Sequence, residues 1–416
     1  MKTTFLTLTV LGAMLAGACD NQGPLVTPGS GGSGAGGSDP AGQGGTTDDA
    51  GAVDAGSATD LGGAGGTAGV AGTAGSGGAA GAGGAAIGTS LGCPAADGSL
   101  PPRAPGVGWV NRSPARPPFS WPAARRSPAM AFDEAAGRTV MYGGYASASP
   151  VTDTWEWNGA DGTWTERKVS PPSVFDMIAT TYDSSRGRMV LFGGETYPSA
   201  GASRALWEWS GATGAWANRT PTSIPTVWPA ARILAVAAYD PQRRRVVIHG
   251  GNPGDDTWEW DPDGGTWLNR SVAPSPERGG AEAFVWDPCR NRGVLFGGGT
   301  GALWEWDGGG GQWTKRNPDG STPWPQARLF AGMVFDTTVG RPLLFGGTAN
   351  QQGLNDLWEW DGVLGRWTSL DGAAPSARPA GRQSAGVAYD TARSRLVVFG
   401  GGGETDLWDV WEWSRP

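Results

Sequence analysis

The sequence predicts an all-β protein, a six-bladed β-propeller closed by an N-terminal outer strand and preceded by a disordered Gly/Ala/Ser-rich tether. A Gly-Gly pair recurs about every fifty residues, and each pair is followed by Trp-Glu-Trp. Repeats of this length with aromatic strands are typical of propeller blades. The pairs begin at Gly143, Gly193, Gly250, Gly297, Gly346 and Gly400, and the triplets at Trp155, Trp207, Trp258, Trp304, Trp358 and Trp411.

Each repeat divides into four short strands, which blade 1 illustrates. Short apolar and aromatic runs bounded by turn residues predict strands over Pro128–Phe132, Thr139–Gly144, Asp153–Asn158 and Thr163–Arg167. The first run carries small residues, as in the third repeat, and these suit an inner strand crowded round an axis. The paired glycines suit close backbone approach or a positive φ.

The order of these strands resembles the kelch repeat. In that family a small-residue strand precedes an apolar strand ending in Gly-Gly, an aromatic strand, and a last strand opening with Trp. Here the last strand opens with Trp164, Trp216, Trp267, Trp313 or Trp367. The resemblance covers all six repeats and implies a kelch-type propeller over residues 105–416.

The sixth repeat lacks its outer strand, because the chain ends at Pro416 soon after Trp411-Glu412-Trp413. The run Gly108–Arg112 matches Thr266–Arg270 of blade 3 position by position. We therefore expect this first strand to complete the last blade. Such closure removes an open sheet edge and sets the blade count at six.

The N-terminal region predicts export. Residues 1–18 read as a signal peptide, with an apolar run too short to span a bilayer. Ala16-Gly17-Ala18-Cys19 resembles the bacterial lipobox, which implies a lipidated Cys19 and anchorage to the outer membrane or cell surface; plain secretion is the alternative. Residues 19–104 form the predicted linker, because few apolar residues are available there to build a core.

The charge of the chain argues against two classes of partner. Six aspartates before residue 61 and Lys2 account for −5 of the net charge of −8, which leaves about −3 for the remainder. A near-neutral domain lacks the basic field that nucleic acid binding requires. We expect no nucleic acid partner, and membrane contact only through the lipid anchor.

Two charge patterns repeat with the blades. An Asp closing the first strand is followed five residues later by Arg, and we expect the Asp to cap the turn and pair with that Arg. The outer-strand Trp is followed three residues later by Arg in five blades, and Leu370 is the exception. That Arg is expected to meet the mid-strand Glu. Both patterns are interpreted as structural.

The sequence predicts no catalytic residue, metal site or cofactor. Kelch propellers include galactose oxidase, whose copper site takes two histidines, but His249 is the single histidine here and stands where other blades carry Phe or Tyr. Asp261–Trp267 resembles the structural Asp-box of sialidases without a placeable catalytic set. No Ser-His-Asp set or phosphate-binding loop is recognisable. We therefore expect no enzyme.

The other two cysteines, Cys93 and Cys289, leave two alternatives open. Cys289 lies in the turn between the first two strands of blade 4, and the strand near Trp109 begins at the same face. A disulfide between them would pin the end of the linker to the domain in an oxidising compartment. Two unpaired thiols are the alternative.

The candidate ligand-binding residues lie in connections on one face. The spacing from Gly-Gly to Trp-Glu-Trp varies from 7 residues in blade 4 to 14 in blade 2, and the connections before blades 1, 3 and 5 carry Trp-Pro followed by Arg. These residues either stack on sugars and bind acidic groups or pack against neighbouring blades. The candidates are Trp121, Arg125, Trp228, Arg232, Trp324, Arg328 and Arg382, with Phe175 at the matching position of blade 2.

The expected function is a non-enzymatic recognition or scaffolding module at the cell surface. Its partner would be an unknown protein or carbohydrate, and the chain is expected to be a monomer. A glycan-binding lectin is the main alternative, and a glycoside hydrolase or a degenerate oxidase-like propeller is a further one. Fold alone does not choose among them.

Overall fold

Every repeat folds into a four-stranded antiparallel sheet, because runs of β-branched and aromatic residues alternate with turns of Gly, Asp and Asn. A computed structural model of the chain describes residues 91–101, 106–147, 149–277, 280–316, 320, 322–371 and 377–416, all within one compact unit, Gly88–Pro416. The predicted signal peptide, Cys19 and the linker up to residue 90 lie outside the described residues. Across the described ranges there is no helix, and so none that would span a membrane.

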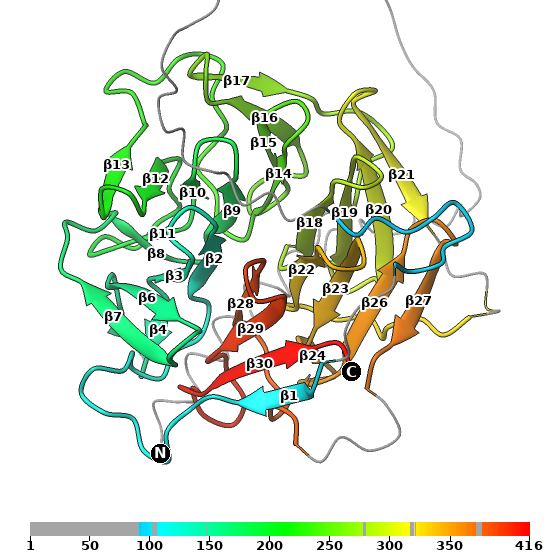
Figure 1. The fold of residues 1–416 in the computed structure, drawn as a ribbon. Coiled ribbons are helices and arrows are strands. Elements are labelled where there is room, and N and C mark those ends of the chain that lie inside the picture. The colour runs from blue at the N-terminus through cyan, green and yellow to red at the C-terminus, as the bar shows by residue number, and fades with distance from the viewer. Residues whose placement is uncertain are drawn as a thin grey trace, which may run out of the picture. The chain divides into compact units, whose positions relative to one another are not determined.

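The six sheets are the predicted blades, and Figure 1 shows them arranged around a common axis. Blades 1 to 3, each from the inner to the outer strand, are β2 (Ala129–Asp133), β3 (Arg138–Tyr142), β6 (Thr154–Asn158) and β7 (Thr163–Arg167); β9 (Ala179–Asp183), β10 (Arg188–Phe192), β12 (Leu206–Ser210) and β13 (Ala215–Asn218); and β14 (Val236–Asp240), β15 (Arg245–His249), β16 (Thr257–Asp261) and β17 (Thr266–Asn269). Blades 4 to 6 are β18 (Ala283–Asp287), β19 (Arg292–Gly297), β20 (Ala302–Asp307) and β21 (Gln312–Arg316); β22 (Gly332–Asp336), β23 (Arg341–Phe345), β26 (Leu357–Asp361) and β27 (Arg366–Ser369); and β28 (Gly386–Asp390), β29 (Arg395–Phe399), β30 (Val410–Ser414) and β1 (Gly108–Asn111).

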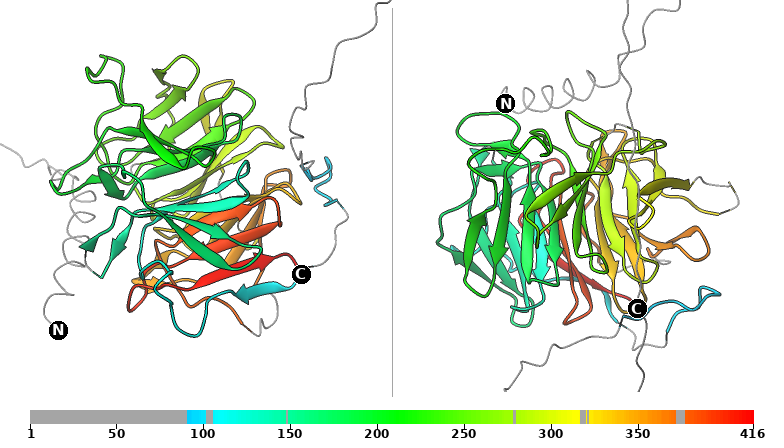
Figure 2. Two further views of the ribbon diagram at one scale, coloured as in Figure 1. Left: turned by 60° about the vertical axis from the view of Figure 1, so that its left-hand side comes forward. Right: turned by 90° about the horizontal axis from the view of Figure 1, so that it is seen from above.

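The six inner strands form a ring, each packing against the inner strands of the two neighbouring blades. Viewed along the axis, each sheet runs outward from this ring (Figure 1), and the view from above shows the blades standing side by side (Figure 2). We call the end that carries the turns after the first and third strands the turn face. The opposite end, with the connections between second and third strands and between blades, is the loop face.

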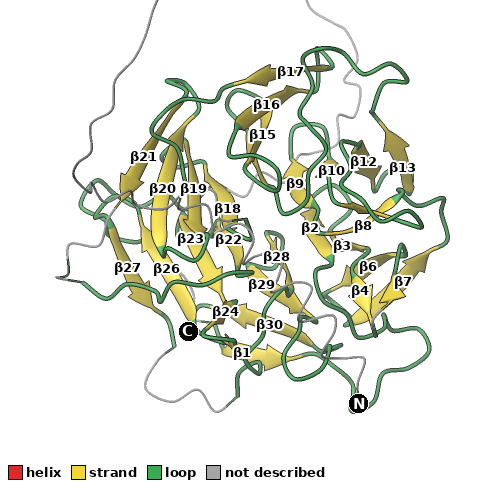
Figure 3. Cartoon of the chain, turned by 180° about the vertical axis from the view of Figure 1, so that it is seen from behind, coloured by secondary structure: helices red, strands yellow, loops and turns green. Residues whose placement is uncertain are grey.

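Three small two-stranded sheets decorate the loop face. They pair β4 (Tyr145–Ala146) with β5 (Ser149–Pro150), β8 (Val174–Asp176) with β11 (Glu195–Thr196), and β24 (Thr348–Ala349) with β25 (Gln352–Gly353). They belong to the connections of blades 1, 2 and 5. The connections on the loop face therefore differ from blade to blade, whereas the four-stranded sheets are alike. Figure 3 labels β4, β8 and β24 of these sheets among the loops that connect the longer strands.

The predicted closure of the ring is confirmed. Strand β1 pairs antiparallel with β30, and Trp109 lies opposite Trp413. This register repeats that of blade 3, where Trp267 lies opposite Trp260. The first strand of the folded domain is therefore the outer strand of its last blade.

The Gly-Gly pair shows why two glycines are needed where the second strand ends. At Gly400 and Gly401 φ is +62° and +96°, and the amide of Gly401 donates to the carbonyl of Arg125 in the next blade (2.9 Å). A Cβ on Gly401 would lie 2.9 Å from the carbonyl oxygen of Gln383. The pair thus combines a left-handed backbone with contact between adjacent blades.

Tryptophan fills the space between the sheets. In blade 1 the rings of Trp157 and Trp164 lie 5.3 Å apart, and the corresponding pairs in blades 2 to 5 lie 5.1 to 5.4 Å apart. Trp157 is fully buried. Burial of such large rings is a main source of stability, and tilted pairs add about 0.5–1.5 kcal/mol each.

The predicted bracing of the first turn is correct for the Asp and wrong for the Arg. Asp183 accepts the amide hydrogens of Ser185 and Arg186, but it pairs with the guanidinium of Arg186, three residues on (2.6 Å). No ion pair joins the Asp to the Arg five residues on in the described residues. That Arg instead reaches the carboxylate at the end of the third strand in blades 3, 4 and 5, as in Arg245–Asp261 (2.9 Å).

The predicted contact between the outer-strand Arg and the mid-strand Glu is confirmed in all five blades that carry the Arg. The pairs are Arg112–Glu412, Arg167–Glu156, Arg219–Glu208, Arg270–Glu259 and Arg316–Glu305. In blade 5, where Leu370 replaces the Arg, Arg341 and Arg415 bind Glu359 instead. The buried glutamate is therefore paired with arginine in every blade, as burial of a charge requires.

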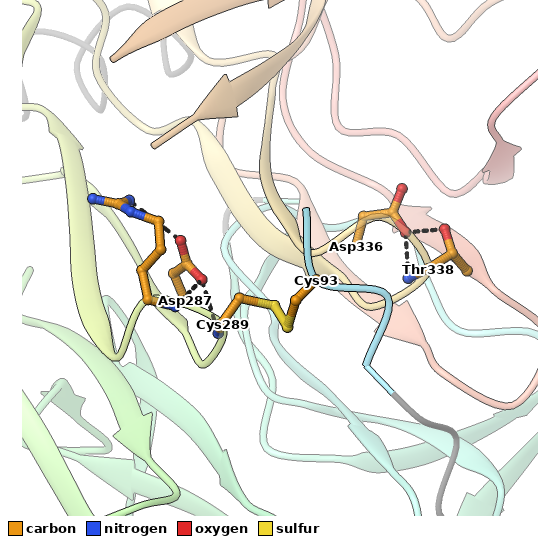
Figure 4. Close-up of a disulfide and its surroundings, with 6 residues drawn as sticks. Cys93, Asp287, Cys289, Asp336 and Thr338 are labelled. Atoms are coloured by element: carbon orange, nitrogen blue, oxygen red, sulfur yellow. Dashed lines mark hydrogen bonds and ion pairs between the residues drawn. A yellow bond between two sulfur atoms is a disulfide. The ribbon is translucent and has the colours of Figure 1, made fainter. Parts of the chain in front are cut away.

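Residues 91–101, which the sequence analysis assigns to the linker, pack as a strap on the turn face. The amide of Gly92 donates to the carbonyl of Thr337 (2.9 Å), and Arg341 donates to the carbonyl of Gly98 (2.5 Å). Cys93 forms a disulfide with Cys289 beside these turns (Figure 4). Of the two alternatives for these thiols, the structure has the bonded one, and it ties the strap to blade 4.

We expect loss of this disulfide to destabilise the propeller. The bond links residues 196 apart in sequence, so replacing both cysteines in a Cys93→Ser, Cys289→Ser variant should lower the free energy of unfolding by about 2–5 kcal/mol. Urea unfolding of the variant and of the wild-type chain, each with and without reductant, measures this. A reductant effect of equal size in both proteins would contradict the assignment.

Candidate functional site

The four candidate arginines are buried on the loop face, each in the same set of bonds. Arg125 donates from Nη1 and Nη2 to the two carboxylate oxygens of Asp153 (2.5 and 2.9 Å), and from Nη1 and Nε to the carbonyls of Gly143 and Ala123. Its exposed fraction is 0%. Arg232, Arg328 and Arg382 repeat this arrangement with Asp256, Asp356 and Asp409.

These ion pairs keep the aspartates charged. Burial alone would raise the pKa of Asp153, but hydrogen bonds from Arg125 and Trp155 and the charge of Arg125 outweigh it, so the pKa lies below its usual value. The same balance holds for Asp256, Asp356 and Asp409. Because most donors of each guanidinium are already used, the structure favours packing over ligand binding for the arginines.

The three candidate tryptophans act as wedges between blades. The indole of Trp121 donates to the carbonyl of Trp408 in the preceding blade (2.9 Å) and packs edge-on against Trp157 (5.8 Å). Trp228 and Trp324 make the same contacts with the carbonyls of Arg204 and Gly301. They therefore bridge blades 6 and 1, 2 and 3, and 4 and 5, and packing is again the favoured alternative. In blade 2, Phe175 is buried in the place of the arginine.

His249 is part of the core. It is 2% exposed, and its Nδ1 lies 3.0 Å from the hydroxyl of Thr257, which also accepts the indole hydrogen of Trp313 (2.9 Å). Burial lowers the pKa of His249 to about 4. The histidine is neutral at physiological pH and fills an aromatic slot, as the sequence predicts.

Two cavities occupy the axis of the propeller. One of about 230 Å³ opens at the loop face, and one of about 250 Å³ opens at the turn face. Side chains of the inner strands line both, and Met130, Phe284 and Met333 border the two cavities where they meet. The small residues Ala129 and Ala131 line this axis as predicted.

A ring of six left-handed residues surrounds the loop-face cavity. None is glycine, and their φ angles lie between +52° and +62°. Backbone hydrogen bonds join four of the six neighbouring pairs in this ring, as from the amide of Ser384 to the carbonyl of Phe330 (3.0 Å). Sequence reasoning missed these residues, since non-glycine residues in this region have no local signature. They are Ser127, Met177, Leu234, Ala281, Phe330 and Ser384.

Polar and aromatic groups lie on the loop face of blades 1 and 2, next in sequence to the left-handed residues Ser127 and Met177; most are at least partly exposed, whereas Asp176 is buried. The guanidinium of Arg126 lies 5.2 Å from the ring centre of Tyr145, and Tyr197, in the longest connection, is 55% exposed. Burial and the nearby Glu195 raise the pKa of Asp176 to about 6. We call Arg126, Tyr145, Asp176, Glu195 and Tyr197 the blade 2 rim. The unusual length of that connection is the one sequence signal for it.

Comparison with known proteins adds no identity. No protein-family model matches the chain, and no curated protein is significantly similar to it in sequence. Within the described ranges, no three His, Cys, Asp or Glu side chains are grouped so as to hold a metal ion.

A stability measurement separates packing from ligand binding for the arginines. Replacing Arg328 by Leu strands the carboxylate of Asp356 in a largely buried site, so we expect a loss of about 3–5 kcal/mol in unfolding free energy. Adding Asp356→Asn should recover part of it, because the unpaired charge is removed. Arg244→Leu, which breaks the exposed pair with Asp263, is the control and should cost about 0–1 kcal/mol. Equal effects of the two arginine variants in urea unfolding would contradict the packing role.

The buried histidine makes a prediction about acid stability. Its pKa is about 4 in the folded chain and near 6.5 when unfolded, so the unfolded state gains a proton as pH falls below 6.5. Stability should therefore decline between pH 6.5 and 4, by about 3 kcal/mol from this group. His249→Phe, with the residue of other blades, should reduce this decline in unfolding experiments at pH 7 and 4. Parallel curves for variant and wild type would refute it.

Proposed function

We propose that this chain is a non-enzymatic recognition or scaffolding module that binds its partner through the loop face. The supporting observation is the contrast between the two faces. An axial cavity opens at each face, but the loop face also carries the variable connections and the blade 2 rim, whereas the strap of residues 91–101 lies on the turn face. A partner that meets the loop face encounters an exposed Tyr197 and the charges of Arg126 and Glu195 beside an apolar mouth.

The setting proposed for this module is the bacterial cell surface. The repeat order that resembles kelch proteins, the signal-like residues 1–18 and the lipobox-like Cys19 support a lipid-anchored kelch-type propeller on a long linker. Because the strap of residues 91–101 lies on the turn face, the loop face is at the opposite end of the propeller from the described end of the linker. The partner class is a protein or a carbohydrate at the surface, and the module works as a monomer.

Site-specific cross-linking tests the assignment of the binding face. A photoreactive amino acid at position 197 of the full-length chain should give discrete cross-linked products with native cell envelope. The same amino acid at Val363, a 38% exposed position in a turn of the turn face, is the matched control and should give none. The same products from both positions, or none from position 197, would refute recognition through the loop face.

A further inference from the structure

At three of the six interfaces between adjacent blades, an arginine of one blade packs over a glycine of the next blade on the turn face. The arginine lies three residues after the Asp that closes the first strand. Its guanidinium packs over the glycine that follows the third strand of the next blade. A Cβ on that glycine would overlap the guanidinium, at Arg393 over Gly159, Arg243 over Gly308 and Arg290 over Gly362. At two of these interfaces the outer-strand Arg also donates to the carbonyl of the glycine, from Arg112 (3.1 Å) and Arg270 (3.2 Å). The glycine therefore lets arginine fill the crevice.

Two of the other interfaces lack the arginine, because Ala136 and Val339 stand in its place. The interface of blades 2 and 3 has the arginine, Arg186, but Pro262 stands at the glycine position. Arg186 and Arg219 of blade 2 bind Glu208 in the usual way (2.6 and 2.8 Å). A cavity of about 450 Å³ lies between them and Pro262. Its volume lies within the range of roughly 300–1,000 Å³ typical of small-molecule sites. We call it the Pro262 cleft.

The walls of the cleft combine apolar surfaces with hydrogen-bonding groups. Trp228, Trp260 and three prolines supply the apolar part; the side chain of Arg219 is 48% exposed and that of Asp263 is 54% exposed. The indole Nε1 of Trp260 is buried with no hydrogen-bond partner in the described residues, as are those of the equivalent Trp209 and Trp306. The cleft thus offers donors, acceptors and flat apolar faces together.

The charges favour a neutral ligand. Arg186 is paired with Asp183 and Glu208, Arg219 shares Glu208, and Asp263 is paired with Arg244. An anion would meet the buried carboxylate of Glu208, and a cation would meet two guanidiniums. A sugar ring has hydroxyl groups for Arg and Asp and apolar C–H faces for Trp and Pro.

We propose that the Pro262 cleft between blades 2 and 3 is a binding site for a neutral saccharide. The hydroxyl groups accept from the terminal guanidinium nitrogens of Arg219 and donate to Asp263, and the ring packs against the Trp228 and Pro262 wall. Trp228 is the one sequence-predicted candidate that lines this cleft. The cleft is lined by the connection between blades 2 and 3 and by the last turn of blade 3, and it includes no residue of the blade 2 rim or of the loop-face cavity. The inference therefore goes beyond the proposed function and does not depend on it.

Saccharide binding to the full-length chain tests the site. Saturation-transfer NMR with the methyl glycosides of glucose, galactose, mannose and N-acetylglucosamine should detect at least one ligand. Pro262→Gly should weaken its binding at least tenfold, because Arg186 and Arg219 can then cross to blade 3 and fill the crevice. Arg219→Gln should weaken saccharide binding to a similar extent, because it removes the guanidinium that donates to the hydroxyl groups. Thermal unfolding of each variant verifies that the propeller remains folded.

Arg316→Gln is the matched control, since Arg316 pairs with Glu305 in the same way and is equally exposed at 47%. It should lose as much stability as Arg219→Gln and keep full saccharide binding. Failure of every glycoside to bind, or equal binding by wild type and Pro262→Gly, would overturn the proposal. A preference for glucuronic acid over glucose, or for a proline-rich peptide over all saccharides, would overturn the neutral-saccharide assignment.

Discussion

The pairing of β1 with β30 is the interaction on which the rest of the structure depends. A ring of six sheets is stable only if every inner strand has two neighbours and every blade has its outer strand, since otherwise an edge and a Trp-rich face are left uncovered. Four paired residues, with Trp109 opposite Trp413, provide this seal. The strap and its disulfide lie just before β1 in the chain, so the region that closes the ring is also held at Cys289.

Ion pairs of arginine stabilise each blade internally and stabilise the contacts between adjacent blades. On the turn face it pairs with the turn Asp and the buried mid-strand Glu, and on the loop face it pairs with the Asp before the aromatic strand. Each carboxylate loses much of its contact with water on folding and accepts hydrogen bonds from a planar guanidinium instead. The charged residues that repeat most regularly are therefore scaffold, which explains why four candidate arginines proved to be buried.

The distinctive sites lie where a blade departs from the repeat. In blade 5, Leu370 stands where the other blades have the outer-strand arginine. Glu359 forms ion pairs with Arg415 and with Arg341, which also donates to the strap. Phe175 replaces an arginine in blade 2, next to the longest connection and the exposed Tyr197. Pro262 replaces a glycine in blade 3, and a cleft is present there. The residues that repeat in the blades build the common scaffold. Substitutions at single repeat positions give individual blades surfaces of their own.

The sequence by itself determined the class of fold, the number of blades, the order of strands, the closure at Trp109 and the pairing of outer-strand Arg with Glu. These follow from periodicity and from residue types that local geometry demands. Only the tertiary structure decided which Asp each turn Arg meets, which non-glycine residues take the left-handed ring, that the strap reaches blade 5, and that a cleft lies beside Pro262. These depend on distances between segments far apart in the chain, which a pattern along one sequence does not encode.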